Sequence, residues 1–156
     1  MRSKIVTQAA ALKIREKLRR TNKRVVFTNG CFDIIHSGHA LYLDAARNLG
    51  DYLIVGLNRD SSVRHLKGKN RPVIGFNERA LLLSYLVPVD LVVGFGDNTP
   101  LRLIKLLKPD ILVKGADYKI SEIIGADIIE ELGGKIMTIP LIRGKSTSSI
   151  IKKLDL

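Results

Sequence analysis

The chain has 156 residues, of which 46% are hydrophobic and 5% aromatic, and its formal charge is +11. This length suits one domain with its own core and excludes a second full-sized domain. The single cysteine excludes an internal disulfide framework, and no apolar run approaches the roughly 20 residues of a membrane-spanning helix. We therefore expect one domain over residues 1–156, with no membrane span and no secretory signal, in the reducing cytoplasm.

The positive charge is concentrated at the start of the chain. Nine of the 26 basic residues, but only one of the 15 acidic residues, fall within residues 1–24. Ala10, Ala11, Ile14 and Leu18 recur there at helical spacing with cations between them, which predicts a basic N-terminal helical segment. This helix is either a solvated face packed on the domain or a surface that attracts polyanions.

Short apolar strands and amphipathic helices alternate after residue 23. We expect strands at 24–28, 52–57, 90–93, 110–113 and 135–139, helices at 37–49, 60–66, 78–87, 100–107, 120–132 and 147–154, and a basic loop at 67–72. Five such strands separated by helices predict an α/β fold, a doubly wound, Rossmann-like five-stranded parallel sheet with helices on both faces. Ligands of such sheets bind beyond the carboxyl ends of the strands, where the strand order reverses.

The turn after the first predicted strand, residues 29–39, carries the most informative residues. His36 and His39 are three apart across a helix start, so both imidazoles can face backbone N–H groups that lack a partner within the helix. Gly38 between them leaves room for a ligand to approach the backbone. The pattern favours an anion site suited to a triphosphate.

Other interpretations of this turn remain open. The two histidines can ligate zinc, with Cys31 or His65 as a third ligand, or they can serve only to cap the helix. Cys31 can pack as a small hydrophobe at the strand end, or act as a nucleophile with His36 as its base. Asp33 can cap the turn, or orient a ligand or a basic group.

A strand followed by Asn-Gly-x-Phe-Asp-x-x-His-x-Gly-His and a helix resembles the signature of the nucleotidylyltransferase superfamily that includes the cytidylyltransferases. Within it, the chain resembles the enzymes that adenylylate D-glycero-β-D-manno-heptose 1-phosphate for the lipopolysaccharide core. The resemblance extends over about residues 7–154 and rests on residues 28–33, 66–68, 71–73, 97–101, 114–118 and 144–147. Ala116 and Lys145 replace the Gly and Tyr usual in that branch, and Leu141 stands where glycerol-3-phosphate cytidylyltransferases carry Arg.

The resemblance implies that a sugar-phosphate oxygen attacks the α-phosphorus of a nucleoside triphosphate and that pyrophosphate leaves. Its catalytic residues are expected to be His36, His39 and Lys67, which stabilise the charge on the phosphates. The expected nucleotide-binding residues are Thr28, Asn29, Gly30, Phe32, Asp33, Gly38, Lys114, Gly115, Asp117, Tyr118, Ser146 and Thr147, and the expected substrate-binding residues are Asn58, Arg71 and Arg79. Mg²⁺ is expected as cofactor, held mainly by the phosphates rather than by protein ligands.

Several of these residues also have purely structural interpretations. Lys67 and Lys69 can belong to a solvated loop, Ser146 and Thr147 can cap a helix, and Tyr118 can pack.

The expected function is transfer of an adenylyl group from ATP to the heptose 1-phosphate, by a homodimer as the resemblance implies. One alternative is a cytidylyltransferase for glycerol 3-phosphate or another small phosphate, which Leu141 disfavours. Another is a nucleic-acid-binding protein on the same fold. The confinement of the charge to one helix disfavours specific nucleic-acid binding.

Overall fold

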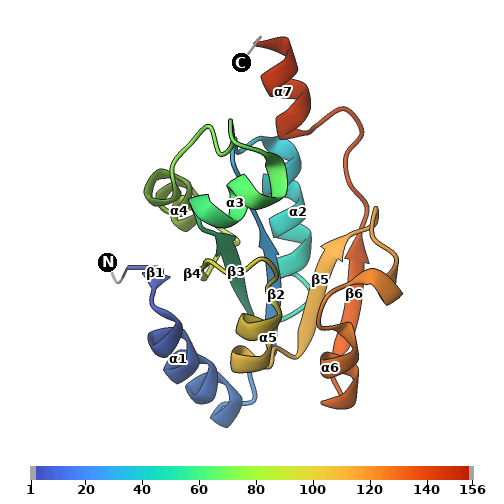
Figure 1. The fold of residues 1–156 in the computed structure, drawn as a ribbon. Coiled ribbons are helices and arrows are strands. Elements are labelled where there is room, and N and C mark those ends of the chain that lie inside the picture. Colours follow the sequence, from blue (N-terminus) through green and yellow to red (C-terminus); the bar gives the residue numbers. More distant parts are fainter. Residues whose placement is uncertain (1–2, 155–156) are drawn as a thin grey trace.

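A six-stranded parallel sheet forms the centre of the molecule (Figure 1). The structure is a computed structural model that describes residues 3–154. Its strands are β1 (Ile5–Val6), β2 (Val25–Gly30), β3 (Tyr52–Asn58), β4 (Leu91–Phe95), β5 (Ile111–Gly115) and β6 (Lys135–Ile139). They lie in the order β1-β4-β3-β2-β5-β6, and every neighbouring pair is parallel.

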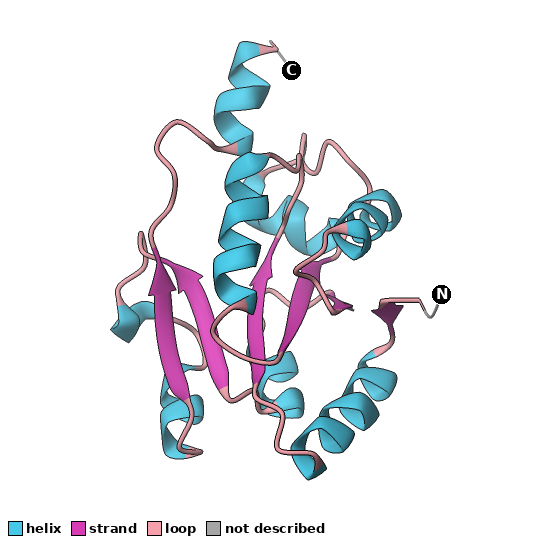
Figure 2. Cartoon of the chain, turned by 180° about the vertical axis from the view of Figure 1, so that it is seen from behind, coloured by secondary structure: helices cyan, strands magenta, loops and turns pink. Residues whose placement is uncertain are grey.

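Helices cover both faces of the sheet, and Figure 2 shows α2 lying across one of them. They are α1 (Gln8–Arg20), α2 (Ser37–Arg47), α3 (Asp60–Lys67), α4 (Phe76–Tyr85), α5 (Leu101–Leu107), α6 (Ala126–Glu131) and α7 (Thr147–Lys153), with a 3₁₀ turn η1 (Ile120–Glu122). Alternate strand residues point to opposite faces, so Val26 packs with α2 and α4, and Phe27 packs with α1, α5 and α6. The predicted α/β, Rossmann-like fold is confirmed.

The predicted count of five strands is wrong, because residues 1–24 contain a strand as well as a helix. Ile5 and Val6 pair with Val92 and Val93 at the edge of the sheet, and only then does α1 begin. A two-residue strand is too short to give an alternating pattern that sequence can reveal.

The helix expected at 120–132 is interrupted. Gly125 has φ +87°, a left-handed conformation that an α-helix cannot continue through, and it separates η1 from α6. The other predicted helices and strands form with small shifts of their ends. Lys67, for example, is the last residue of α3 rather than the first of a loop. None of the helices in residues 3–154 is long and apolar enough to cross a membrane.

The strand order reverses at β2. From β2 the chain adds β3 and β4 on one side, then crosses over to add β5 and β6 on the other. The carboxyl ends of β2 and β5 therefore flank the crevice in which open α/β sheets bind ligands. Residues 29–39, the histidine turn, and residues 114–118 lie at these two ends.

Candidate active site

A cavity of about 600 Å³ opens at the carboxyl ends of the strands. The residues proposed from sequence that line it are His36, His39, Lys67, Asn29, Gly30, Phe32, Asp33, Gly38, Asn58, Arg71, Lys114, Gly115, Asp117, Tyr118, Ser146 and Thr147. The fold thus brings together side chains that lie far apart in the sequence.

The two histidines stand side by side at the first turn of α2. Their rings stack with centroids 3.9 Å apart, and the Phe32 ring lies 5.1 Å from that of His39. Within the described residues, His36 Nδ1, His39 Nδ1 and Asn29 Oδ1 are buried without a hydrogen-bond partner. Because an unpaired buried polar atom is costly, these three atoms indicate a site built for a polar ligand.

Both imidazoles are neutral near pH 7. Burial, followed by repulsion from His36, lowers the pKa of His39 to about 4. Burial, followed by repulsion from Lys145, also lowers the pKa of His36. A neutral imidazole keeps one N–H donor, so each ring can donate to a phosphate oxygen, and a bound anion would raise both pKa values again.

Gly38 keeps the space beside the histidines open. A Cβ at this position would lie 3.0 Å from the His36 ring and 3.1 Å from the Lys145 Cβ. The residue also belongs to the first turn of α2, where the N–H groups of Ser37 and Gly38 precede that of His39, the first to bond to the His36 carbonyl. A ligand can therefore approach these groups only because position 38 has no side chain.

Charged side chains of both signs line the cavity, with cations in slight excess. Lys114 donates from Nζ to the Asn29 carbonyl at 3.4 Å, and its Nζ lies 5.6 Å from the centre of the Tyr118 ring. Burial lowers the pKa of Lys114 to about 8, although Cys31 and Asp117 act in the opposite direction and raise it. The lining cations are Lys67, Arg71, Lys114 and Lys145, and the lining carboxylates are Asp33, Asp117 and Glu122. This excess of positive charge suits a polyanion.

The turn after β5 supplies a second wall. A Cβ at Gly115 would lie 2.5 Å from Asp117 Oδ1, so glycine is what lets the Asp117 side chain fold back over the end of the strand. Tyr118 is 49% exposed and lines the cavity, which leaves its ring free to contact a ligand.

The hydroxyls of Ser146 and Thr147 are engaged within the protein. Ser146 Oγ accepts from the Ser149 N–H at 3.1 Å and caps α7, which is the structural interpretation of this residue. Thr147 Oγ1 donates to the Ile34 carbonyl at 3.2 Å and so ties α7 to the histidine turn.

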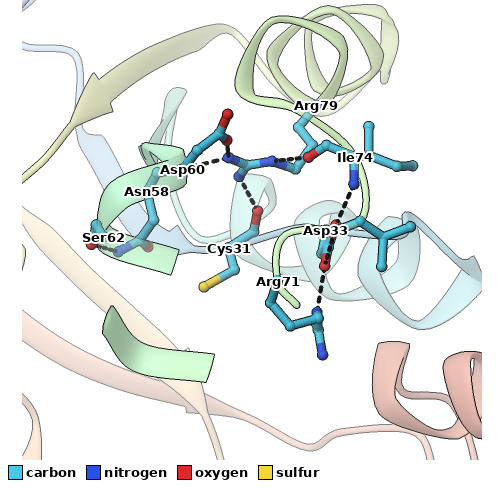
Figure 3. Close-up of polar contacts among 9 residues, drawn as sticks. Cys31, Asp33, Asn58, Asp60, Ser62, Arg71, Ile74 and Arg79 are labelled. Atoms are coloured by element: carbon cyan, nitrogen blue, oxygen red, sulfur yellow. Dashed lines mark hydrogen bonds and ion pairs between the residues drawn. The ribbon is translucent and has the colours of Figure 1, made fainter. Parts of the chain in front are cut away.

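Asp33 binds protein groups, whereas the sequence predicted that it binds nucleotide. Its carboxylate is 1% exposed and accepts from Arg71 Nε at 2.6 Å and from the Val73 and Ile74 N–H groups at 2.9 Å (Figure 3). Burial alone would raise the pKa of Asp33, but these hydrogen bonds lower it below its ordinary value. The sequence left open whether Asp33 caps the turn or orients a ligand or a basic group. In the structure it orients a basic group, the Arg71 guanidinium.

Thr28 and Arg79 do not line the cavity, contrary to expectation. Thr28 is fully buried, with its hydroxyl 2.8 Å from the Tyr42 hydroxyl. Arg79 is also fully buried, and its guanidinium donates to backbone carbonyls and to Asp60 instead of facing a substrate phosphate. Residue type and spacing placed both near the site, but they do not reveal which way a side chain points.

Sequence reasoning missed a third wall of the cavity. Asn98, Thr99 and Pro100 follow β4, at the same edge of the sheet as the turns after β2 and β5; residues 97–101 supported the family resemblance but were not proposed as site residues. Tyr42 is one helical turn beyond His39, a spacing that could have identified it. The remaining lining residues not proposed for the site are Cys31, Leu66, Glu122, Ile123, Ile124, Leu141, Ile142, Lys145 and Ser148.

Neither zinc ligation nor a cysteine nucleophile gains support from the geometry. No group of three or more His, Cys, Asp or Glu side chains in residues 3–154 is placed to hold a metal ion. Burial raises the pKa of the Cys31 thiol, although the positive charges of Lys67, Arg79 and Arg71 lower it in part. The raised pKa disfavours the reactive thiolate.

Residues 27–153 match the model of the cytidylyltransferase-like family. The bifunctional protein HldE of Paramagnetospirillum magneticum is 50% identical over 153 residues, which cover 98% of this chain and 31% of that protein. The bifunctional protein HldE of Campylobacter curvus is 55% identical over 135 residues, which cover 86% of this chain and 28% of that protein. The chain thus spans less than a third of the length of these curated relatives.

Solved structures share the fold. The lipopolysaccharide core biosynthesis protein from Thermoplasma volcanium is 32% identical, with a TM-score of 0.63 over 79% of this chain and 99% of that one. A pantoate-β-alanine ligase from Francisella tularensis, 15% identical with a TM-score of 0.68 over 91% of this chain and 68% of that one, supports the Rossmann-like fold alone.

Proposed function

Because the chain belongs to the cytidylyltransferase-like family and is a nucleotidyltransferase, we propose that it transfers the adenylyl group of ATP to D-glycero-β-D-manno-heptose 1-phosphate. Pyrophosphate is the second product. The similarity to the HldE proteins and to a lipopolysaccharide core biosynthesis protein supports a place in the synthesis of lipopolysaccharide core precursors.

The observation that carries this proposal is the set of three unpartnered buried atoms within the described chain, Asn29 Oδ1, His36 Nδ1 and His39 Nδ1. They lie at the end of β2 and the start of α2, in a cavity lined by four cations and three carboxylates. A triphosphate supplies the many acceptor oxygens and the negative charge that such a site requires.

The chemistry needs positioning and charge neutralisation more than a strong base. The attacking sugar phosphate is ionised near neutral pH, so its oxygen is already a nucleophile. His36 and His39 would donate to oxygens of the α-phosphate and the leaving group, where negative charge grows in the transition state. Lys67 and Lys114 would act as point charges on the phosphates.

Mg²⁺ is part of the proposal, with the nucleotide phosphates as its main ligands. The described residues offer no cluster of three protein ligands, but Asp117 and Glu122 bring carboxylate oxygens, the donors Mg²⁺ prefers, to the cavity wall. The ion would neutralise charge on the pyrophosphate leaving group.

The resemblance to heptose 1-phosphate adenylyltransferases supports two further parts of the proposal, ATP as the nucleotide and a homodimer as the assembly. Leu141 lines the cavity as an apolar side chain where glycerol-3-phosphate cytidylyltransferases have Arg, which argues against CTP with that acceptor. The same resemblance supports a homodimer, whose mass in sedimentation equilibrium would be twice the 17.3 kDa of the chain.

Pyrophosphate release from a matrix of nucleoside triphosphates and sugar phosphates, with and without Mg²⁺, tests the function. The proposal expects release with ATP and the heptose 1-phosphate, strongly reduced when either is replaced or Mg²⁺ is chelated. Release with CTP and glycerol 3-phosphate would replace the substrates but keep the enzyme class. No release from any pair would contradict nucleotidyl transfer to sugar phosphates.

A further inference from the structure

Arg79, on α4, is a fully buried cation that binds three separate segments of backbone around the cavity. Its guanidinium donates to the carbonyl of Cys31 in the histidine turn, to that of Asn58 at the end of β3 (2.9 Å) and to that of Ile74 (2.8 Å). Its charge is balanced by Asp60, whose Oδ1 lies 2.7 Å from Nη2 (Figure 3).

Both backbone polar groups of Ile74 are hydrogen-bonded. Its carbonyl accepts from Arg79, and its N–H donates to Asp33 at 2.9 Å. Asp33 belongs to the histidine turn, so the 68–75 loop is bound to that turn through Arg79 and Asp33 together. The loop carries Arg71, whose Nε is fixed by Asp33 and whose side chain lines the cavity.

We propose that Arg79 is a positioning residue, which fixes the histidine turn against the 68–75 loop and thereby aligns the two reactants for in-line attack. This inference rests on the nucleotidyl transfer proposed above. In that reaction the histidines would hold one reactant on the turn, and Arg71, which also lines the cavity, would hold the other on the loop. The distance between attacking oxygen and phosphorus then depends on how firmly these two segments are joined.

The chain contains a matched control for the loss of a buried guanidinium. Arg15, on α1, is 2% exposed and also binds two carbonyls and one carboxylate, those of Leu107, Lys108 and Asp110. It does not line the cavity. Arg15→Met and Arg79→Met therefore remove the same group from similar surroundings, and only the second loosens the site.

Steady-state kinetics give the first readout. Both variants should lose thermal stability, but only Arg79→Met should lower kcat, by about 10- to 100-fold relative to Arg15→Met. The KM of each substrate should change by less than about threefold, because each reactant keeps the contacts made by its own segment. Arg79→Lys, which keeps the charge beside Asp60, should recover part of kcat.

The single cysteine gives a second readout that needs no substrate. The Cys31 carbonyl is the Arg79 ligand, and its thiol lines the cavity, so freeing this backbone should speed labelling of the thiol by 5,5′-dithiobis(2-nitrobenzoic acid). We expect Arg79→Met to react at least about tenfold faster than Arg15→Met, as a local opening would allow.

Should Arg79→Met fail to fold, Asp60→Asn takes its place, because Asp60 is partly exposed and its substitution weakens only one contact of Arg79. The inference is overturned if kcat lies within about twofold of the Arg15→Met value. It is equally overturned if the labelling rates of the two variants agree. If the wild type releases no pyrophosphate, the proposed function fails, and the labelling comparison alone decides whether Arg79 fixes the turn.

Discussion

In the proposed reaction His36 and His39 would reach the phosphates as neutral donors, because burial lowers the pKa of both imidazoles. Charge stabilisation by such donors is greatest where negative charge develops. We expect His39→Ala to lower kcat by roughly 10²–10³ with little change in the far-ultraviolet circular dichroism.

His65 is a control for this substitution, because it is an exposed histidine on α3 that does not line the cavity. His65→Ala should leave kcat unchanged. A His39→Ala enzyme with wild-type kcat would remove His39 from the mechanism and leave it a structural residue at the helix start.

Lys114 gives the free enzyme a pH dependence. Its folded pKa, about 8, is below the ordinary 10.5, so it loses its charge as pH rises through about 8. We expect kcat/KM to fall over that range, since kcat/KM reports groups of the free enzyme. In kcat the same fall should lie at higher pH, because bound phosphates favour the charged form. Lys114→Arg should abolish the fall near pH 8, and its persistence would assign the titration to another group.

The partners of the buried polar residues could not be predicted from the sequence. The spacing of His36, Gly38 and His39 follows from helix geometry, and the cavity does collect all three. Asp33 and Arg79 depend on contacts with residues 38 and 48 positions away in the sequence, which no local pattern encodes. Their roles needed the structure.

At the scale of elements, α2 has a glycine, Gly38, in its first turn, where this residue lowers the helix propensity but leaves space for the proposed ligand. Alanine is about 1 kcal/mol more favourable than glycine inside a helix. Gly38→Ala should therefore change the free energy of unfolding by less than about 1 kcal/mol, because the gain in helix propensity is offset by crowding of the new methyl group against the His36 ring and the Lys145 Cβ. The KM for nucleotide should rise, by about tenfold or more, since the methyl group occupies the approach to the backbone.

Urea unfolding and nucleotide titration of the same Gly38→Ala preparation separate these two effects. A parallel loss of stability and affinity would mean that position 38 matters for the fold rather than for the ligand. Ser37→Ala, an exposed change on the same turn, should alter neither quantity appreciably.

Elements with a full period of apolar residues were predictable, and short or interrupted ones were not. Strands β2, β3 and β4 each contain at least three consecutive apolar residues, and this pattern predicts them. Strand β1 has two residues and exists only because β4 offers a free edge to it. The interruption at Gly125 depends on a left-handed backbone, which the apolar pattern of residues 120–132 conceals.

On the scale of the whole molecule, the basic N-terminal helix and the cavity are separate. Lys13, Lys17, Arg19 and Arg20 are exposed on α1 and do not line the cavity, while Arg15 on the same helix is buried. The helix packs on α5 and β4 and runs away from the end of the sheet where α7 lies (Figure 1).

Replacing those four exposed cations by Gln should therefore leave pyrophosphate release unchanged. Any binding to duplex DNA should weaken sharply, because these cations would supply the contacts with the phosphates. Each lost contact should also reduce the magnitude of the slope of log K against log salt by about 0.9. Filter binding over a salt series and the pyrophosphate assay on one preparation measure both. Sequence-selective binding by the wild type, with no pyrophosphate release, would favour the nucleic-acid-binding alternative.

The reversal of strand order at β2 also governs when the site can exist during folding. The cavity is closed by the histidine turn from the first half of the chain and by the turn after β5 from the second, and Lys114 contacts Asn29, which lies 85 positions away in the sequence. Neither half can assemble the site alone, and pairing so distant in sequence is slow to form. A growing chain would therefore acquire the nucleotide affinity proposed for it only after β5 has paired with β2, so that ligand binding would report the formation of this one pairing.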